Sequence, residues 1–360
     1  MSIPSAAPTP ATAPTPTLQW ADPQREAHLH TWLAGLPAEL ALQASTLRLA
    51  SADASFRRYL RIESNRGSLV IMDAPPDKED CKPFVQVDRL MQGAGLRVPD
   101  ILAWEETHGF LLLTDLGAKT MLQSMDLQAA PPLDWYLQAV DLLVQWQLAS
   151  QPGVLPAYDK ALLLRELELF PQWYIAQHRQ VTLNDKQRAT LNDAFERIIQ
   201  SNLEWPSVYV HRDFMPRNLM MSDQGMGVLD FQDAVYGPIT YDIASLMRDA
   251  FLSWDEEFCL DVTVRYWQKA RKAGLPVGDD FGAFYQGVEW MGLQRHLKVA
   301  GIFARLTLRD GKPQYLADTP RFIHYIRSTC SRYMALKPLL RLVESIEGIE
   351  VPATFVFGKP

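Results

Sequence analysis

One short stretch, residues 208–233, carries two aspartates and an asparagine whose types and spacing suit phosphoryl transfer. Asp213 follows an apolar run, Asn218 lies five residues later, and Asp230 follows a second apolar run. A carboxylate at a strand exit can accept the proton of an attacking hydroxyl and orient its oxygen. An amide oxygen and a second carboxylate are hard ligands of the kind that Mg²⁺ prefers. We therefore predict Asp213 as the catalytic base, and Asn218 and Asp230 as metal ligands.

These residues belong to a longer pattern. Single aspartates at strand ends and asparagines in loops are common in proteins without any catalytic role. Here the segment reads His-x-Asp-x-x-x-x-Asn, and the strand after it ends in Asp-Phe, which matches the catalytic and metal-binding signature of kinases. His211 is either a proton acceptor or a structural group. We favour a neutral histidine that holds the loop, because Asp213 is better suited to accept the proton.

Composition indicates a globular protein and excludes several classes of function. The chain has 360 residues, 48% of them apolar and 21% charged, and is long enough for two lobes. Its net charge of −7 argues against a nucleic-acid partner. No apolar run is long enough to cross a membrane. Cys81, Cys259 and Cys330 are too scattered for a zinc site or a disulfide framework, so we expect a reducing, cytoplasmic location.

The first 17 residues consist largely of proline, alanine and threonine. They lack the basic start and apolar core of a secretory signal. We expect residues 1–17 to form a disordered tail of extended, polyproline-like character. Its composition favours a tail without a function of its own.

The first third of the chain is predicted to form a sheet with two helices. Apolar runs predict strands at residues 45–49, 58–62, 68–72, 101–104 and 110–113, and helices are predicted at 23–36 and 80–93. The loop at residues 50–57 is rich in small residues, which let backbone N–H groups approach phosphate oxygens. It is either a nucleotide-binding loop or an ordinary hairpin turn. As a nucleotide-binding loop, it predicts contacts from Ser55, Phe56 and Arg58.

The strand at residues 110–113 runs into the sequence Thr-Asp-Leu-Gly at 114–117. This segment is either a hinge between lobes or a plain strand exit. As a hinge, the backbone around Leu113 and Asp115 would meet the edge of an adenine. We predict a small β-rich lobe at residues 18–114 and a larger, mainly helical lobe at residues 115–360.

From Leu133 onward the apolar pattern changes to the helical period. Further helices are predicted at residues 162–178, 185–200, 241–250, 256–273, 280–306 and 319–347. Everything after about residue 118 is expected to be helical apart from the two short strands that precede Asp213 and Asp230. No internal repeat is visible.

We call residues 208–233 the catalytic segment. Its sequence HRDFMPRN at residues 211–218, its Asp230-Phe231 pair, and the sequence YGPITYDIASL at residues 236–246 resemble the aminoglycoside phosphotransferase family. That family is the small-molecule branch of the kinase fold and includes choline and homoserine kinases. The resemblance implies an α+β, bilobal protein-kinase-like fold, with ATP and Mg²⁺ as cofactors. Protein kinases are excluded, because Asp242 follows Asp230 by only 12 residues and leaves no room for an activation segment.

Two features depart from the family pattern. The strand lysine that binds the phosphates would fall near Met72, where no lysine stands, and the glycine-rich loop is replaced by Ser-Ala-Asp-Ala-Ser at residues 51–55. Substitutes for the lysine include Arg57, Arg58, Lys78 and Lys82. A non-catalytic scaffold is the alternative, although the complete Asp213, Asn218 and Asp230 set argues against it.

Within the family, the segments ADASFRRY at residues 52–59, VIMDAPP at 70–76 and HRDFMPRN at 211–218 resemble bacterial anomeric kinases of cell-wall amino sugars. The resemblance implies phosphorylation of the C1 hydroxyl of N-acetylmuramate and N-acetylglucosamine. Choline, homoserine or an aminoglycoside is the alternative acceptor. The expected partner is a small sugar, without an obligate protein partner. Acceptor contacts are expected from Arg217, Tyr236, Trp290, Arg295 and His296.

Arg295 is the candidate for the lactyl carboxylate of N-acetylmuramate, because arginine suits planar bidentate recognition. The alternative for Trp290, Arg295 and His296 is a packed or solvated helix face without ligand contacts.

Overall fold

The computed structural model describes residues 18, 20, 22–52 and 56–349. The chain divides into two compact units. Unit 1 comprises Met1–Val85 and Pro99–Asp115, and unit 2 comprises Gln86–Val98 and Leu116–Pro360. The tail predicted at residues 1–17 and the nucleotide contact predicted at Ser55 lie outside the described residues. The predicted lobe boundary after residue 114 stays a prediction.

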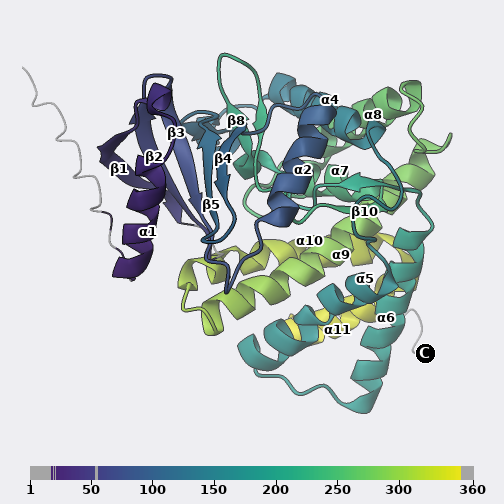
Figure 1. The fold of residues 1–360 in the computed structure, drawn as a ribbon. Helices are drawn as coiled ribbons and strands as arrows, with labels where there is room; N and C mark the ends of the chain where they lie inside the picture. The colour runs from purple at the N-terminus through teal and green to yellow at the C-terminus, as the bar shows by residue number, and fades with distance from the viewer. Residues whose placement is uncertain (1–17, 19, 21, 53–55, 350–360) are drawn as a thin grey trace, which may run out of the picture. The chain divides into compact units, whose positions relative to one another are not determined.

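Unit 1 is built on a five-stranded antiparallel sheet (Figure 1). The spatial order is β1-β2-β3-β5-β4. The strands are β1 (Gln43–Ala52), β2 (Arg58–Ser64), β3 (Gly67–Asp73), β4 (Ile101–Glu105) and β5 (Phe110–Thr114). All five predicted strands are confirmed, with small differences at their ends.

Helix α1 (Pro23–Ala34) packs on one face of this sheet. The Asp22 side chain caps it by accepting a hydrogen bond from the Gln24 N–H group. Its buried Leu29 and Leu33 share a core with alternate residues of β2, β3 and β5. A short 3₁₀ turn, η1 (Ala38–Leu40), follows. The predicted helix at residues 23–36 is confirmed, and so is the next one, α2 (Lys82–Gly93).

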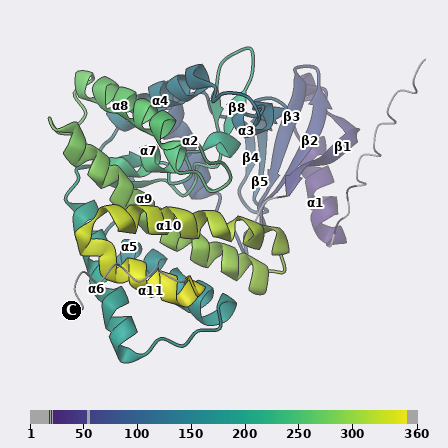
Figure 2. The same cartoon turned by 180° about the vertical axis from the view of Figure 1, so that it is seen from behind.

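Unit 2 is mainly helical, and Figures 1 and 2 show α9 and α10 running side by side. Its helices are α3 (Met121–Ser124), α4 (Leu133–Leu148), α5 (Lys160–Leu167), the π-helix η2 (Phe170–His178), α6 (Asp185–Leu203), α7 (Thr240–Met247), α8 (Glu256–Lys272), α9 (Phe281–Leu308), α10 (Thr319–Arg332) and α11 (Lys337–Glu347). Short 3₁₀ turns are η3 (Pro216–Asn218), η4 (Pro313–Asp318) and η5 (Met334–Leu336).

Helix α9 forms the centre of unit 2, because most of its residues from Phe284 to Leu306 are buried. A helix that is enclosed on all sides needs close approaches to its neighbours. Gly301 provides one: a Cβ atom there would lie 2.4 Å from the backbone carbonyl of Leu169. Side chains from α9 can therefore reach the catalytic segment from inside the core.

Two predicted helices are divided in the structure. The helix predicted at residues 319–347 is α10 and α11, separated by an extended Tyr333 and by η5. Pro338 stands in the first turn of α11, where its missing N–H group needs no partner. The helix predicted at 162–178 is α5 followed by η2, whose first turn contains Pro171. In both places a proline stands in the first turn of the second helix, a position that suits the start of a helix but not the continuation of the preceding one.

The prediction of only two strands after residue 118 is wrong. Strand β7 (Ser207–Val210) pairs with β10 (Val235–Pro238), and β6 (Lys119–Thr120), β8 (Leu219–Met221) and β9 (Gly227–Val228) form a second small sheet. These strands have two to four residues, too few to show an alternating pattern in the sequence. These short strands form because of their tertiary contacts, which the sequence pattern does not reveal.

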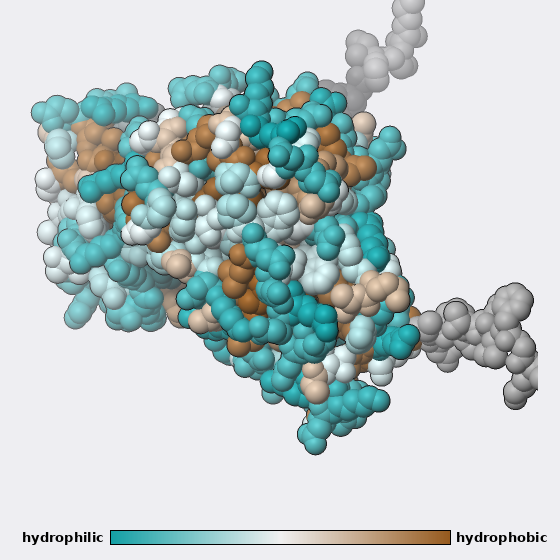
Figure 3. Space-filling view, turned by 90° about the vertical axis from the view of Figure 1, so that its right-hand side faces the viewer, coloured by the Kyte–Doolittle hydropathy of each residue, from teal (hydrophilic) through white to brown (hydrophobic). Residues whose placement is uncertain are grey.

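Figure 3 shows a face where hydrophobic residues stand among hydrophilic ones. Large apolar side chains that are exposed include Leu148, Leu203 and Leu260, which lie on or beside different helices of unit 2. Within the described parts of the chain, no helix is both long and apolar enough to span a membrane.

Candidate active site

Two short antiparallel pairs position the catalytic segment in unit 2. Strand β7 pairs with β10 and ends at Val210, directly before His211. Gly237 lies opposite Val208, and a Cβ atom on it would lie 2.6 Å from the Cβ of Tyr158. Only glycine fits this close approach. The β8–β9 pair then returns the chain so that Asp230 comes back beside Asn218.

Asp242, on α7, holds the backbone at the start of the segment. Its carboxylate accepts the N–H group of His211 at 2.7 Å and that of Arg212 at 3.0 Å. Burial raises the pKa of Asp242 to about 6, although His211 and the two backbone hydrogen bonds oppose this shift. Asp242 thus links the first turn of α7 to the catalytic loop.

His211 is fully buried and joins the two aspartate-bearing segments. Its Nε2 lies 3.0 Å from the carbonyl oxygen of Leu229, and its Nδ1 accepts the backbone N–H of Asp213 at 3.2 Å. Burial lowers the pKa of His211, so the ring is neutral with the proton on Nε2. These contacts suit the structural role that we favour for His211, in which a neutral ring links the backbone at Asp213 to the backbone at Leu229.

Arg212 has a left-handed backbone conformation, with φ of 77°, and the side chains of Glu166 and Arg295 contact it directly. Its guanidinium forms an ion pair with Glu166 of α5. Glu166 also pairs with Lys298 of α9 at 3.0 Å and accepts the Tyr158 hydroxyl. Arg295 of α9 donates a hydrogen bond to the Arg212 carbonyl at 2.6 Å. Buried groups from two helices thereby set the direction of the next residue, Asp213.

Asp213 lies partly buried in a basic environment. Burial would raise the pKa of its carboxyl, but the nearby Lys298 and Arg295, followed by Arg212, lower it below the ordinary value. The carboxylate is therefore ionised at neutral pH. This is the protonation state that a base needs.

The predicted metal ligands lie beside Asp213. The Asn218 side-chain amide donates to the Asp213 carbonyl at 2.9 Å and to Asp230 Oδ2 at 3.2 Å. Gln232 donates to Asp230 Oδ1 at 2.9 Å, and Asp230 itself has a φ of 63°. Three predicted site residues are thus brought together in unit 2.

The donor set formed by Asn218 and Asp230 fits Mg²⁺, because both offer hard oxygen atoms and magnesium usually completes its shell with water and phosphate. Among the residues that the structure describes, no three His, Cys, Asp or Glu side chains form a cluster able to hold a metal. A metal ion coordinated mainly by protein side chains would need such a cluster, whereas Mg²⁺ at Asn218 and Asp230 would take its remaining ligands from water and phosphate.

The predicted nucleotide contacts lie in unit 1. Phe56 is 62% exposed and its N–H donates to Glu79, which also pairs with Arg57 at 3.1 Å. Arg58 forms an ion pair with the fully buried Asp73 and lies 4.2 Å over the Trp20 ring. The two adjacent arginines therefore have different partners.

Leu113 and Asp115, the residues predicted to lie at a hinge, also belong to unit 1. Leu113 is a buried residue of β5, and the carboxylate of Asp115 pairs with Arg61 of β2 at 2.8 Å. This ion pair fixes the end of β5 to a strand two places away in the sheet.

The structure places the five predicted acceptor residues in different surroundings. Arg217 belongs to the catalytic segment, and its guanidinium lies 4.5 Å over the Phe251 ring. Tyr236 is on β10 with its ring against Tyr209, and Trp290 packs against Tyr333. Arg295 contacts Arg212, as described above, and His296 stacks on Tyr325.

Trp290, Arg295 and His296 are all buried, so the packed-helix alternative describes their surroundings. Their predicted acceptor contacts stay predictions. Sequence reasoning missed Glu166, Lys298 and Asp249, which lie in predicted helices without any motif. Asp242 lies within the segment at residues 236–246 that resembles the family, but the sequence alone did not indicate its role.

Comparison with known proteins gives a consistent result. The model of the phosphotransferase enzyme family matches residues 46–280. A Pseudomonas aeruginosa protein named N-acetylmuramate/N-acetylglucosamine kinase is 50% identical over 302 residues, which cover 84% of this chain and 89% of that protein. A Neisseria meningitidis protein of the same name is 47% identical, with 91% of this chain and 97% of that protein covered.

Solved structures share the fold at low identity. A choline/ethanolamine kinase family protein from Mesorhizobium loti has a TM-score of 0.59 at 13% identity, covering 89% of this chain and 99% of that one. ADP-bound aminoglycoside phosphotransferase APH(2'')-Ib has a TM-score of 0.55 at 16% identity, covering 84% and 97%. The predicted α+β protein-kinase-like fold is confirmed. Because the family model matches well over half of its length, the chain belongs to the phosphotransferase enzyme family.

Proposed function

We propose that this enzyme transfers the γ-phosphoryl group of ATP to the C1 hydroxyl of N-acetylmuramate and of N-acetylglucosamine. The observation that carries the proposal is the convergence of Asp213, Asn218 and Asp230, joined through the Asn218 amide. The names of relatives at 50% and 47% identity support the two sugars as acceptors.

Asp213 is the proposed base. Its low pKa, maintained by Lys298, Arg295 and Arg212, makes it a weak base in water. An anomeric hydroxyl is more acidic than an ordinary alcohol, so modest help from a carboxylate suffices. Positioning of the hydroxyl and neutralisation of charge then supply most of the rate enhancement.

Asn218 and Asp230 would hold Mg²⁺ through the amide and carboxylate oxygens. When bound, the ion neutralises charge on the phosphate oxygens of the nucleotide. Gln232 donates to Asp230 and so orients the carboxylate. The left-handed backbone of Asp230 turns its side chain toward Asn218.

Nucleotide contacts are proposed from Phe56, Leu113 and Asp115, with the phosphate contact on Arg57 rather than Arg58. The guanidinium of Arg58 is shared between the buried Asp73 carboxylate and the Trp20 ring. Arg57 pairs with Glu79, and Glu79 also binds the N–H of Phe56 at the end of the small-residue loop. Arg57 therefore supplies a positive charge near this loop. In the family pattern, a lysine near position 72 supplies that charge.

The test is ATP consumption with a panel of acceptors. We expect turnover with N-acetylmuramate and N-acetylglucosamine, and loss of it in the Asp230→Ala variant. Turnover with choline or an aminoglycoside, while both amino sugars are inert, would contradict the proposed substrates. An absence of turnover with every acceptor would favour a non-catalytic nucleotide-binding protein.

A further inference from the structure

The loop between α7 and α8, residues 248–255, lies beside the catalytic segment within unit 2. Phe251 in this loop lies under the guanidinium of Arg217, which directly precedes the proposed metal ligand Asn218. Ser253 Oγ accepts hydrogen bonds from Arg321 at 2.8 Å and from Tyr325 at 2.7 Å, both on α10. The loop therefore connects the catalytic segment to α10.

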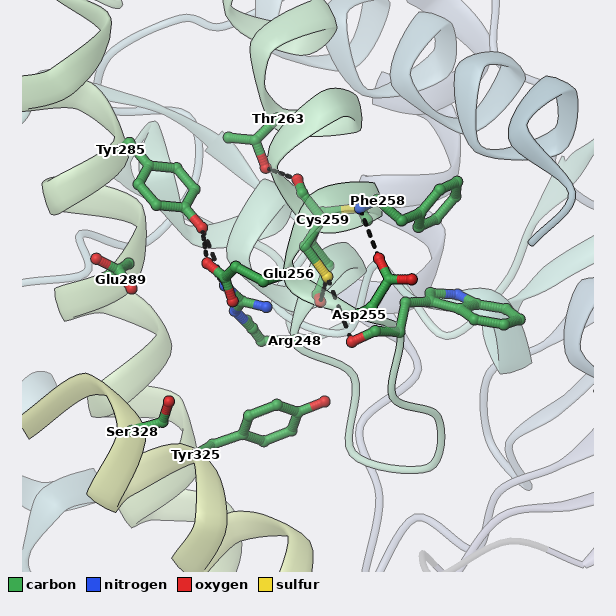
Figure 4. Close-up of polar contacts among 12 residues, drawn as sticks. Arg248, Asp255, Glu256, Phe258, Cys259, Thr263, Tyr285, Glu289, Tyr325 and Ser328 are labelled. Atoms are coloured by element: carbon green, nitrogen blue, oxygen red, sulfur yellow. Dashed lines mark hydrogen bonds and ion pairs between the residues drawn. The ribbon is translucent and has the colours of Figure 1, made fainter. Parts of the chain in front are cut away.

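The start of this loop is firmly anchored. Arg248 donates to Glu256 at 2.9 Å and to the Tyr285 hydroxyl at 3.1 Å, and Figure 4 shows these side chains gathered together. The backbone carbonyl of Arg248 lies 3.3 Å from His296 Nε2. With its side chain and its carbonyl both engaged, Arg248 leaves little freedom to the residue that follows it, Asp249.

Asp249 is 2% exposed and carries unused hydrogen-bonding capacity. Its Oδ1 accepts the Phe251 N–H at 2.9 Å, whereas its Oδ2 has no hydrogen-bond partner among the residues that the structure describes. A buried acceptor without a donor destabilises the fold. Such a group is retained where a ligand or a bound water supplies the missing hydrogen.

Positive charge around Asp249 also reaches the proposed base. Burial raises the pKa of Asp249 to about 6, and Arg295, Arg321 and Arg217 oppose the shift. Arg295 likewise acts on Asp213. Two carboxylates thus lie within the field of one buried guanidinium, one of them at the reacting centre and the other beside it.

We propose that Asp249 Oδ2 accepts a hydrogen bond from a hydroxyl group of the acceptor sugar, and that Arg321 binds the carboxylate of an acidic sugar. The inference rests on the proposed function and deepens it. A carboxylate is a strong acceptor for hydroxyl donors, which every sugar offers. Arg321 is suited to the second role because its side chain is 27% exposed, its ion pair with Asp318 is long at 3.7 Å, and its planar guanidinium matches a carboxylate.

The two roles separate the acceptors. Asp249 contacts a group common to N-acetylglucosamine and N-acetylmuramate, so it determines affinity for both. Arg321 meets only the lactyl carboxylate that N-acetylmuramate carries. Arg295 is less suited to this task, because its guanidinium is buried against the Arg212 carbonyl and the Tyr241 ring.

The experiment measures KM and kcat for both sugars, and stability in urea, for wild type, Asp249→Asn, Arg321→Gln and Asp261→Asn. Asp261 lies on α8 with a side chain that is 43% exposed, and it serves as the matched control. We expect Asp249→Asn to raise KM for both sugars by about 10-fold or more, with KM for ATP unchanged. We expect its urea midpoint at neutral pH to be equal to or above that of wild type, because the variant loses a buried unpartnered charge.

For Arg321→Gln we expect KM to rise about 10-fold for N-acetylmuramate only. A destabilised or unfolded Asp249→Asn variant, or unchanged KM values, would overturn the role of Asp249. Equal effects of Arg321→Gln on both sugars, or none, would overturn the role of Arg321. Wild-type enzyme that is inactive on both sugars would instead refute the proposed function itself.

Discussion

Arg295, deep in helix α9, donates a hydrogen bond of 2.6 Å to the backbone carbonyl of Arg212, the residue before the proposed base. The same guanidinium lies 4.9 Å over the ring of Tyr241 and is 2% exposed. This buried cation on α9 orients the catalytic loop, and after Lys298 it contributes to lowering the pKa of Asp213. Its position explains how a loop with two left-handed residues, Arg212 and Asp230, is held.

Arg295→Lys should lower kcat by about 10-fold while KM for ATP stays the same. Lysine keeps the charge but lacks the planar donors that reach the Arg212 carbonyl. Steady-state kinetics on the purified variant measure this effect. Arg265→Lys, in an exposed ion pair with Asp261, is the control. A folded Arg295→Lys enzyme with wild-type kcat would show that the contact does not position the base.

Glu166→Gln should destabilise the protein by about 3 kcal/mol, because Arg212 and Lys298 would keep buried charges without their shared partner. Urea unfolding at neutral pH measures the change. Glu196→Gln removes the partner of Lys160 in an exposed pair and should change the unfolding free energy by less than about 1 kcal/mol. Similar effects of the two substitutions would contradict the importance of the buried network.

The pH dependence of stability should reveal the buried Asp249. Its pKa in the folded protein is about 6, above the ordinary 3.8, so the folded state binds the proton more tightly than the unfolded state does. Its contribution to stability is therefore present at low pH and is lost as pH rises through about 6.

Asp249→Asn removes this titration. The free energy of unfolding of the variant relative to wild type should rise by roughly 1–3 kcal/mol between pH 4.5 and pH 7.5. Urea unfolding at the two pH values tests this, with Asp261→Asn as the exposed control. Parallel pH profiles for Asp249→Asn and wild type would show that Asp249 titrates normally.

Arg57→Gln should raise KM for ATP by about 10-fold with little change in KM for the sugar, since a phosphate contact is charge-assisted. Initial rates at varied ATP measure it. Arg48→Gln, which removes a half-exposed ion pair with Glu63 on the neighbouring strand, is the control. If Arg58→Gln alone raised KM for ATP in a folded enzyme, the phosphate contact would belong to Arg58.

The sequence was sufficient for the parts of the site that depend on local pattern. Asp213, Asn218 and Asp230 lie within one motif, and the structure brings them together because two short strand pairs return the chain on itself. The five strands of unit 1 and the capped helix α1 were likewise predictable from alternation and from Asp22.

Groups that support the site were not predictable, because their roles arise from contacts between distant residues. Glu166 meets Arg212 across 46 positions, and Arg295 meets it across 83. In the sequence, nothing distinguishes Asp249 from other aspartates near helix ends, because its burial results from tertiary packing. The division between α10 and α11 was missed because apolar periodicity continues on both sides of Tyr333.

Direct observation of the product tests the central claim. Phosphorus NMR of a reaction with ATP and N-acetylmuramate should show a sugar 1-phosphate with wild-type enzyme. The rate should be lower by about 10² or more with Asp213→Asn, which keeps the shape of the side chain and removes its basicity. A phosphate on any other hydroxyl, or an Asp213→Asn enzyme with the wild-type rate, would contradict the account.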